Sequence, residues 1–563
     1  MKKIIAVILA VCLIAVCCPA VFAEKEPALT FALASDLHYN APREEITFVS
    51  EDDIFWYANR RCAMEDESGF IIDEFLRQCA ENDDIRYVLI SGDLADNGKS
   101  RPEDHKAVAE KLRAFEQATG KDVFVINGNH DAGNNCNTTL DDFKRIYADF
   151  GYDKALEKVD TDCSYTADLG EKYRLIALDS TDPDQSTADG MNAKKLSWVL
   201  RQADKAYADG RYPVVMMHHN LLDHMPLQRI FSHDFIVRFH YTTASLFADR
   251  GIKLVMTGHE HCSDVSSYTS AAGNVIYVLA TTSLTMYPLQ FRVMTLSEDR
   301  IEYETATVDK IDTGALTAAT AGYTPEQIAL MNAGLNDYAK GFLKQGIKYR
   351  LALSLTMEKM GISEDDFYYD LVNTAVGGLT SVLRQPLYGE NSVSALAAEY
   401  GIDIPASDYK TGWDLATELV SYHYAGGESF ELDSAEVTIL LRTVALILRS
   451  DLAQVNDEVF LKAANELLGC DEGMTQAATK LCCSVFGGVK PGEYFIISLL
   501  SPLLYEFAVD ADGVDDNNGA FDGYGCSSFE NKMANIGENL RNAIHKLVKY
   551  MLCFMELFSR MFK

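Results

Sequence analysis

The sequence predicts an α/β domain in its first half and a mainly α-helical region in its second half. Short runs rich in Val, Ile and Leu, each followed by Gly, Asn or a charged residue, alternate with helical patterns through the first half, as the buried strands of an α/β sheet do. Beyond Thr313 the apolar residues recur with helical spacing, and the breaks fall at Gly and Pro. With 563 residues the chain exceeds what one hydrophobic core usually supports, so at least two domains are expected.

The N-terminus predicts export. Lys2 and Lys3 precede an apolar run, and small or permissive residues lead to Ala23, a pattern typical of a bacterial-type signal peptide cleaved after that residue. The mature protein is then expected to be secreted or associated with the cell envelope. Cys17 and Cys18 leave a lipoprotein as the alternative. The predicted boundaries are a signal peptide at 1–23, an α/β domain at 24–312 and a helical domain at 313–563.

Composition restricts the partners. The formal net charge of −33 disfavours long nucleic acids, because proteins bind them by neutralising phosphates with Lys and Arg. Thirteen cysteines in a chain of this length do not make a disulfide scaffold, and the sequence leaves any pairing open. Oligomeric state stays open as well.

Two segments near the C-terminus are distinctive. A stretch rich in Asp, Asn and Gly between Asp510 and Gly525 predicts a solvated loop. The final stretch, between Arg541 and Lys563, predicts an amphipathic helix with a cationic character. It would pack on the helical domain, self-associate or lie on an anionic membrane surface, and packing is the favoured interpretation.

Five of the predicted strands end in loops that carry His, Asp or Asn. The strands are expected at 29–34, 87–90, 123–126, 214–217 and 254–256, and the loops read DLH, GDLAD, GNHD, HH and GHEH. Because ligands gather at the carboxyl ends of strands in open α/β sheets, these loops are expected to line one crevice. The candidate metal ligands are Asp36, His38, Asp93, Asn129, His218, His259 and His261.

These residue types predict a site for two divalent ions. Two ions roughly 3.5–4 Å apart can clamp the attacking and the leaving oxygen of a phosphoryl group. The mixed imidazole, carboxylate and amide ligands suit Mn, Fe or Zn and do not select among them. Each motif alone is ordinary, since Gly, Asn and Asp are common in turns and at helix caps. Their joint occurrence in this order is what points to a metal site.

In this order the motifs resemble the signature of the calcineurin-like metallophosphoesterases, which runs D-x-H, G-D-x-x-D, G-N-H-D, a His after a strand, and G-H-x-H. Around Tyr287 and Arg292 the chain is also similar to exported bacterial members that resemble cyclic-nucleotide phosphodiesterases. For the α/β half, the resemblance implies a four-layer αββα sandwich.

The resemblance also implies a role for each residue. Asp36, His38 and His261 would hold one metal, Asn129, His218 and His259 the other, and Asp93 would bridge the two. His130 would act on the substrate phosphate as general acid or oxyanion stabiliser, and Asp96 would orient His130 through a hydrogen bond. His219 would support a ligand or contact the substrate.

The sequence therefore predicts an exported, dinuclear phosphoesterase in which a metal-bound hydroxide attacks phosphorus. We expect small phosphodiesters, such as cyclic nucleotides or glycerophosphodiesters, because the motif loops offer no Arg or Lys for the extra charge of a monoester. The nearest basic candidates are Arg60, Arg61 and Arg292. The alternatives are a phosphomonoesterase of acid-phosphatase type and a binding protein that is stabilised by its metals.

Overall fold

The computed structural model describes residues 28–42, 62–184, 189–224, 228, 233–354, 363–365, 369–431, 434–449 and 514–525. The predicted signal peptide, Arg60, Arg61 and the stretch between Arg541 and Lys563 lie outside the described residues. Among the helices that are described, none is long and apolar enough to cross a membrane.

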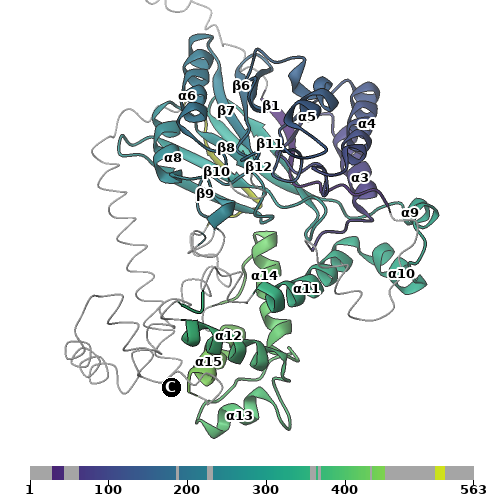
Figure 1. Cartoon of the computed structure of the whole chain (residues 1–563), viewed down its shortest axis with the longest axis vertical. Helices are drawn as coiled ribbons and strands as arrows, with labels where there is room; N and C mark the ends of the chain where they lie inside the picture. Colours follow the sequence, from purple (N-terminus) through teal and green to yellow (C-terminus); the bar gives the residue numbers. More distant parts are fainter. Residues whose placement is uncertain are drawn as a thin grey trace, which may run out of the picture.

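The first half of the chain, with one strand from the second half, forms two β-sheets packed face to face, with helices on both outer faces (Figure 1). One sheet has the order β13-β12-β11-β1-β2-β3 and the other β4-β5-β6-β7-β8-β10-β9. The strands of the first sheet are β1 (Leu29–Ala34), β2 (Ile85–Ile90), β3 (Asp122–Val125), β11 (Gln290–Leu296), β12 (Arg300–Thr307) and β13 (Asn518–Asp522). Those of the second are β4 (Glu157–Lys158), β5 (Tyr165–Leu169), β6 (Tyr173–Leu178), β7 (Tyr212–Met217), β8 (Leu254–Thr257), β9 (Asp264–Thr269) and β10 (Val275–Ala280).

All five strands that the sequence predicted before the motif loops are present, as β1, β2, β3, β7 and β8. Alternation along a strand explains why they read as continuous apolar runs. In β7, Val214 and Met216 belong to the core between the two sheets, whereas Val215 and Met217 face the outer helices. Successive side chains of a strand point to opposite faces, so a strand covered on both sides is apolar throughout.

Helices cover the two outer faces. On the first sheet lie α3 (Ser68–Glu81), α4 (Pro102–Thr119) and α5 (Leu140–Ile146); on the second lie α6 (Ala193–Ala208) and α8 (His240–Asp249). Trp198 and Val199 of α6 and Phe247 of α8 fill the layer against the second sheet. The predicted four-layer α/β sandwich is confirmed.

The described part of the second half is mainly helical, as the sequence predicted, and its helices lie beside one end of the sandwich (Figure 1). Its described helices are α9 (Thr313–Ala319), α10 (Pro325–Ala333), α11 (Leu335–Ser354), α12 (Tyr369–Arg384), α13 (Val393–Glu399), α14 (Gly412–Ala425) and α15 (Ala435–Arg449). The expected helix start with proline is present in α10, where Thr324 caps the backbone N–H of Gln327 and Pro325 follows the cap.

The expectation of a solvated loop up to Gly525 is wrong for β13. This strand pairs antiparallel with β12 and extends the first sheet. Phe521 stacks on Tyr277 with ring centroids 3.9 Å apart, so one aromatic residue fixes a strand that is otherwise Asn, Gly, Ala and Asp. The C-terminal half therefore returns to the α/β domain at β13, beyond the predicted boundary at 312/313.

Candidate metal centre

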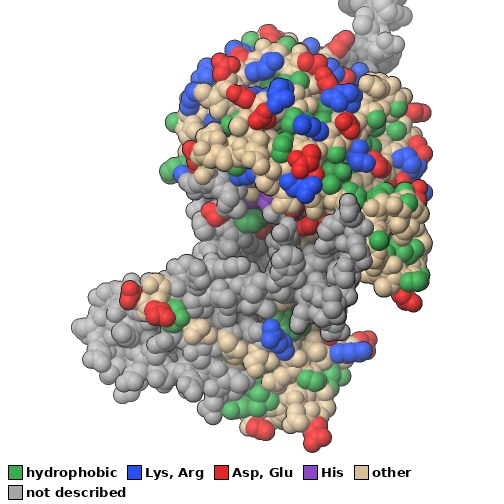
Figure 2. Space-filling view, turned by 45° about the vertical axis from the view of Figure 1, so that its right-hand side comes forward, with side chains coloured by type: hydrophobic (Ala, Val, Ile, Leu, Met, Phe, Trp, Pro, Cys, Tyr) green, Lys and Arg blue, Asp and Glu red, His purple; other side chains and the backbone are tan. Residues whose placement is uncertain are grey.

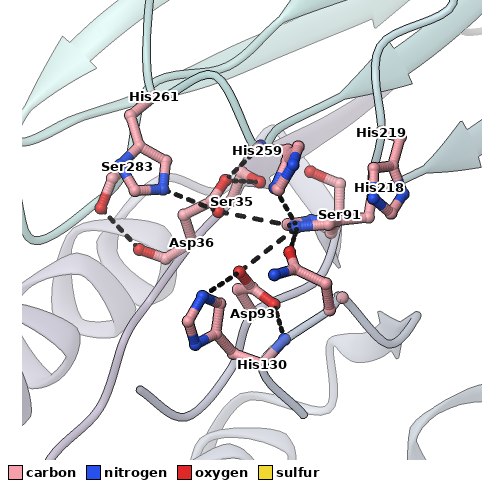
Figure 3. Close-up of polar contacts among 12 residues, drawn as sticks. Ser35, Asp36, Ser91, Asp93, His130, His218, His219, His259, His261 and Ser283 are labelled. Carbon is pink, nitrogen blue, oxygen red and sulfur yellow. Dashed lines mark hydrogen bonds and ion pairs between the residues drawn. The ribbon is translucent and has the colours of Figure 1, made fainter. Parts of the chain in front are cut away.

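The motif loops of both sheets meet at one place. Strands β1, β2 and β3 run parallel, as do β7 and β8, so each set presents its carboxyl ends together. Figure 3 shows the Asp and His side chains from these loops pointing toward a common centre between the sheets. The structure thus brings together all seven residues that the sequence nominated as ligands.

The backbone at the centre is unusual. Five ligand residues have a positive φ, from 39° to 69°, a region that non-glycine residues seldom adopt. They are Asp36, His38, Asp93, His259 and His261. Such conformations cost free energy and cluster at functional sites, where the surrounding structure enforces them. The positive φ values indicate that the backbone of these loops is held in an uncommon conformation that places the five side chains at the site.

Two motif glycines allow the loops to approach one another. A Cβ on Gly128 would lie 2.2 Å from Asp93 Oδ1, and a Cβ on Gly258 would lie 1.8 Å from Ser35 Oγ. Both distances are shorter than any side chain permits, so the Gly of each motif is required by packing against the neighbouring loop.

Asp36, His38 and His261 form one group, which we call the His261 half-site. His261 Nε2 lies 3.2 Å from Asp36 Oδ1 and 3.1 Å from His38 Nε2. Asp36 Oδ2 accepts hydrogen bonds from Ser35 Oγ at 2.5 Å and from the backbone N–H of His259 at 2.9 Å. Burial alone would raise the pKa of Asp36, but the nearby His261 and His218 outweigh it and lower that pKa to about 2. Asp36 is therefore a carboxylate at neutral pH.

Asn129, His218 and His259 form the other group, the His218 half-site. His218 Nε2 lies 3.0 Å from Asn129 Oδ1 and 3.1 Å from His259 Nδ1. His218 Nδ1 donates to the carbonyl oxygen of Ser91 at 3.0 Å, which turns Nε2 toward the centre. Phe235 stacks on the ring of His259, with centroids 4.2 Å apart.

Asp93 lies between the two half-sites. Its Oδ2 is 3.3 Å from His218 Nε2 and 4.0 Å from His38 Nε2, and the residue is buried. Burial opposes ionisation, yet the charges of His218 and His130 hold the pKa of Asp93 well below its usual value. One carboxylate oxygen thus faces both groups, which is the arrangement that a bridging ligand needs.

The donor set fits two metal ions. His218 Nδ1 carries the proton that Ser91 accepts, so a neutral His218 turns its Nε2 lone pair toward the oxygens of Asn129 and Asp93. Lone pairs that converge in this way repel one another unless a cation, or a proton, lies among them. Without a metal the proton takes that place: burial disfavours it, but Asp93 and Asp36 raise the pKa of His218 to about 9. Three His/Asp groups suited to metal binding occur here, and Asp93 belongs to two of them.

His130 and Asp96 are near each other, but not through the expected atoms. His130 Nδ1 donates to the backbone carbonyl oxygen of Asp96 at 2.9 Å, whereas the Asp96 carboxylate lies 3.3 Å from His38 Nδ1. The backbone of Asp96 therefore orients His130, and its side chain supports His38. A sequence motif identifies Asp96 but does not show whether its backbone carbonyl or its carboxylate makes a given contact.

Two further residues that the sequence nominated are buried in the structure. His219 is buried, and its Nδ1 lies 2.9 Å from Ser180 Oγ. Its ring lies 4.5 Å from that of His259, which places it behind a ligand. Arg292, a candidate for phosphate binding, is also buried, and its guanidinium donates to Asp516 O, Ser263 Oγ and Ala280 O. It is turned toward the C-terminal segment.

Sequence reasoning missed three neighbours of the ligands. Met286 Sδ lies 2.9 Å from His261 Nδ1, Ser35 supports Asp36, and Phe235 covers His259. Ser35 precedes D-x-H and could have been nominated by its position. Met286 and Phe235 carry no signal in the sequence, because an apolar residue reads as core wherever it occurs.

The fold and the site together define a two-sheet α/β sandwich with a histidine- and aspartate-rich centre that could hold metal ions. Residues 29–263 match the model of the calcineurin-like phosphoesterase family. A search of curated proteins gave no match.

Similar solved structures share little sequence with the chain. A dimetal phosphatase from Danio rerio has a TM-score of 0.35 and 14% identity, covering 50% of this chain and 97% of its own. The NAD nucleotidase of Haemophilus influenzae has a TM-score of 0.28 and 10% identity, covering 56% and 60%. The sulfate thiohydrolase of Thermus thermophilus has a TM-score of 0.27 and 16% identity, again covering 56% and 60%. The similarity to the family rests on the match over residues 29–263 and not on these scores.

Proposed function

We propose that the chain is a dinuclear, metal-dependent phosphoesterase that hydrolyses small phosphodiesters. The observation that carries the proposal is the position of Asp93, whose Oδ2 faces ligand groups from both sheets. Asp36, His38 and His261 would hold one ion, Asn129, His218 and His259 the other, and Asp93 both. Two bound divalent ions would polarise the phosphoryl group and supply a nucleophile at neutral pH.

His130 is the group of this chain that would act on the leaving oxygen. Its backbone N–H donates to Asp93 Oδ1 at 2.7 Å, and its Nδ1 donates to Asp96 O. These two contacts fix both ends of the residue and direct Nε2 toward the centre, 3.9 Å from Asp93 Oδ2. A protonated Nε2 would stabilise charge on the phosphoryl oxygens or protonate the leaving group. The partial exposure of His130 fits contact with a substrate.

The preference for diesters rests on charge. A monoester dianion asks for more positive charge around the phosphate than a diester monoanion does. Arg292 is the one nominated arginine that the structure describes. Its guanidinium donates hydrogen bonds to Ser263 Oγ and to the backbone of the C-terminal segment. The excess of acidic residues over basic ones further disfavours highly charged substrates at a distance.

We propose further that the protein acts outside the cytoplasm, on the strength of the N-terminal signal pattern. Determination of the N-terminal residue of protein recovered from an expressing bacterial host tests this. Export with cleavage after Ala23 supports the proposal, and an uncleaved protein retained in the cytoplasm contradicts it.

The test of substrate class compares kcat/KM for bis-(p-nitrophenyl) phosphate and p-nitrophenyl phosphate with Mn, Fe or Zn loaded. We expect the diester to be the better substrate with at least one metal. A preference for the monoester with all three metals would favour the phosphomonoesterase. Two tightly bound metals without turnover of either ester would favour a metal-stabilised binding protein.

A further inference from the structure

The loop after the last metal motif is held by the C-terminal half of the chain. Ser263 follows His261 by two residues and is the point of attachment. Its backbone N–H donates to the carbonyl oxygen of Tyr424, in the last turn of α14, at 3.1 Å. Its Oγ accepts from Arg292 Nη2 at 2.9 Å and donates to Asn517 Oδ1 at 3.4 Å. Elements far apart in the sequence therefore converge on one residue beside a predicted ligand.

Asn517 connects these elements. Its Nδ2 donates to the carbonyl oxygens of Ala425 and Gly426, at 2.8 and 2.7 Å, so it caps the C-terminal end of α14. Gly426 comes so near to the loop that a Cβ there would lie 2.5 Å from Ser263 O. Next to Asn517, the backbone carbonyl of Asp516 accepts from Arg292 at 2.6 Å. One asparagine thus ties the end of a helix to the loop of the metal motif.

The ring of His261 contacts a side chain that packs against the helical half. Met286, whose Sδ lies 2.9 Å from His261 Nδ1, is completely buried. It belongs to an apolar cluster with Leu343 and Ile347 of α11, against which Val420 and Tyr424 of α14 pack. The helical half therefore contacts the backbone of the loop directly, and it packs against the methionine that contacts the ring of His261.

We infer that Asn517 is a positioning residue for His261, and that the C-terminal half completes the metal centre. The inference rests on the proposed dinuclear site. His261 has a φ of 63°, which the chain does not adopt without support from its surroundings. Contacts behind a metal ligand commonly change metal affinity by about 10–100-fold when they are removed. Loss of the Asn517 contacts should therefore act on one half-site only.

The variant Asn517→Ala tests this in the full-length protein. Titration of the metal-free protein with Co²⁺, followed by calorimetry and by the visible spectrum, separates the two binding steps. We expect affinity at the His261 half-site to fall by about tenfold or more, with the other step unchanged. Tyr524→Phe is the matched control, because Tyr524 anchors the same segment through Pro213 O at 2.6 Å, away from the metal loops. We expect it to bind both ions as the wild type does.

Equal effects of the two variants on thermal stability, with both binding steps unchanged, would overturn the inference and leave the segment a purely structural role. If Asn517→Ala does not fold, Ser263→Ala decides, because it removes the Oγ contacts and keeps the backbone hydrogen bond to α14. Wild-type binding in Ser263→Ala would likewise overturn the inference. A wild-type protein that binds fewer than two ions would instead refute the proposed function, so the two failures are distinguishable.

Discussion

The two halves of the metal centre differ in what stands behind their histidines. In the His218 half-site, His218 is completely buried and held by a main-chain carbonyl, and Phe235 covers His259. In the His261 half-site, His261 is 11% exposed and is backed by the sulfur of Met286, a weak hydrogen-bond acceptor. One half-site is fixed by the sheet framework, and the other depends on side chains and on the C-terminal half.

This difference between the half-sites indicates that the proposed dinuclear centre combines a rigidly held ligand group, the His218 half-site, with an adjustable one, the His261 half-site. A main-chain carbonyl at the end of a central strand moves little, since the sheet holds it on both sides. A methionine has three rotatable side-chain bonds and adapts to its surroundings. We therefore expect the His218 half-site to retain its ion more tightly than the His261 half-site.

The largest effect is expected for Asp93→Asn, which should affect both half-sites. Asp93→Asn takes away the carboxylate that lies between the two half-sites, so both ions should bind weakly and turnover should fall by orders of magnitude. Metal analysis after dialysis and assays of diester hydrolysis measure the two quantities. Asp122→Asn, which changes an exposed carboxylate of β3 paired with Lys154, is the control. Two tightly held ions and normal turnover in Asp93→Asn would refute the bridging role.

The next effect separates chemistry from metal binding. His130→Ala should lower kcat by roughly 10²–10⁴-fold, the usual contribution of a general acid or base, with metal content unchanged. Steady-state kinetics and metal analysis on the same preparation check this. Loss of metal from the variant would show that His130 is a ligand and that its assigned role is wrong.

A smaller change addresses the adjustable half-site directly. Met286→Leu removes the sulfur next to His261 Nδ1 while nearly conserving volume. It should lower the affinity for the ion at the His261 half-site several-fold and leave the affinity at the His218 half-site unchanged. Competition with a chelator measures both affinities. Met294→Leu, in the buried part of β11, matches the chemical change away from the site. Equal metal affinities in Met286→Leu and Met294→Leu would show that the sulfur contact does not contribute to metal binding.

A further prediction concerns stability and not metal binding, at a histidine that supports the site without facing it. His105 is buried between Asp131 O and Tyr147 Oη, and burial lowers its pKa to about 4. The unfolded chain binds a proton near pH 6.5, so stability is lost as pH falls from about 6.5 to about 4, by up to about 3 kcal/mol. Denaturant unfolding of metal-free wild type and His105→Gln across this range isolates the contribution. Parallel pH profiles for the two proteins would contradict it.

The sequence predicted the strands, and the residues that meet at the candidate site, for a physical reason. Buried strands need apolar residues on both faces, and metal chemistry needs His, Asp and Asn, so both leave recognisable patterns. The groups that support the ligands leave no comparable pattern in the sequence. Ser91 and Asp96 act on His218 and His130 through backbone carbonyls, which any residue provides. Asn517 approaches Ser263 from 254 positions away in the chain, and only the fold brings them together.

The most direct test of the central claim is a crystal structure of the protein with Mn²⁺, with the ions located by anomalous scattering. The account predicts two ions roughly 3.5–4 Å apart. One should lie among Asp36, His38 and His261 and the other among Asn129, His218 and His259, with Asp93 in contact with both. A single ion in this centre, or two ions that share no ligand, would contradict it.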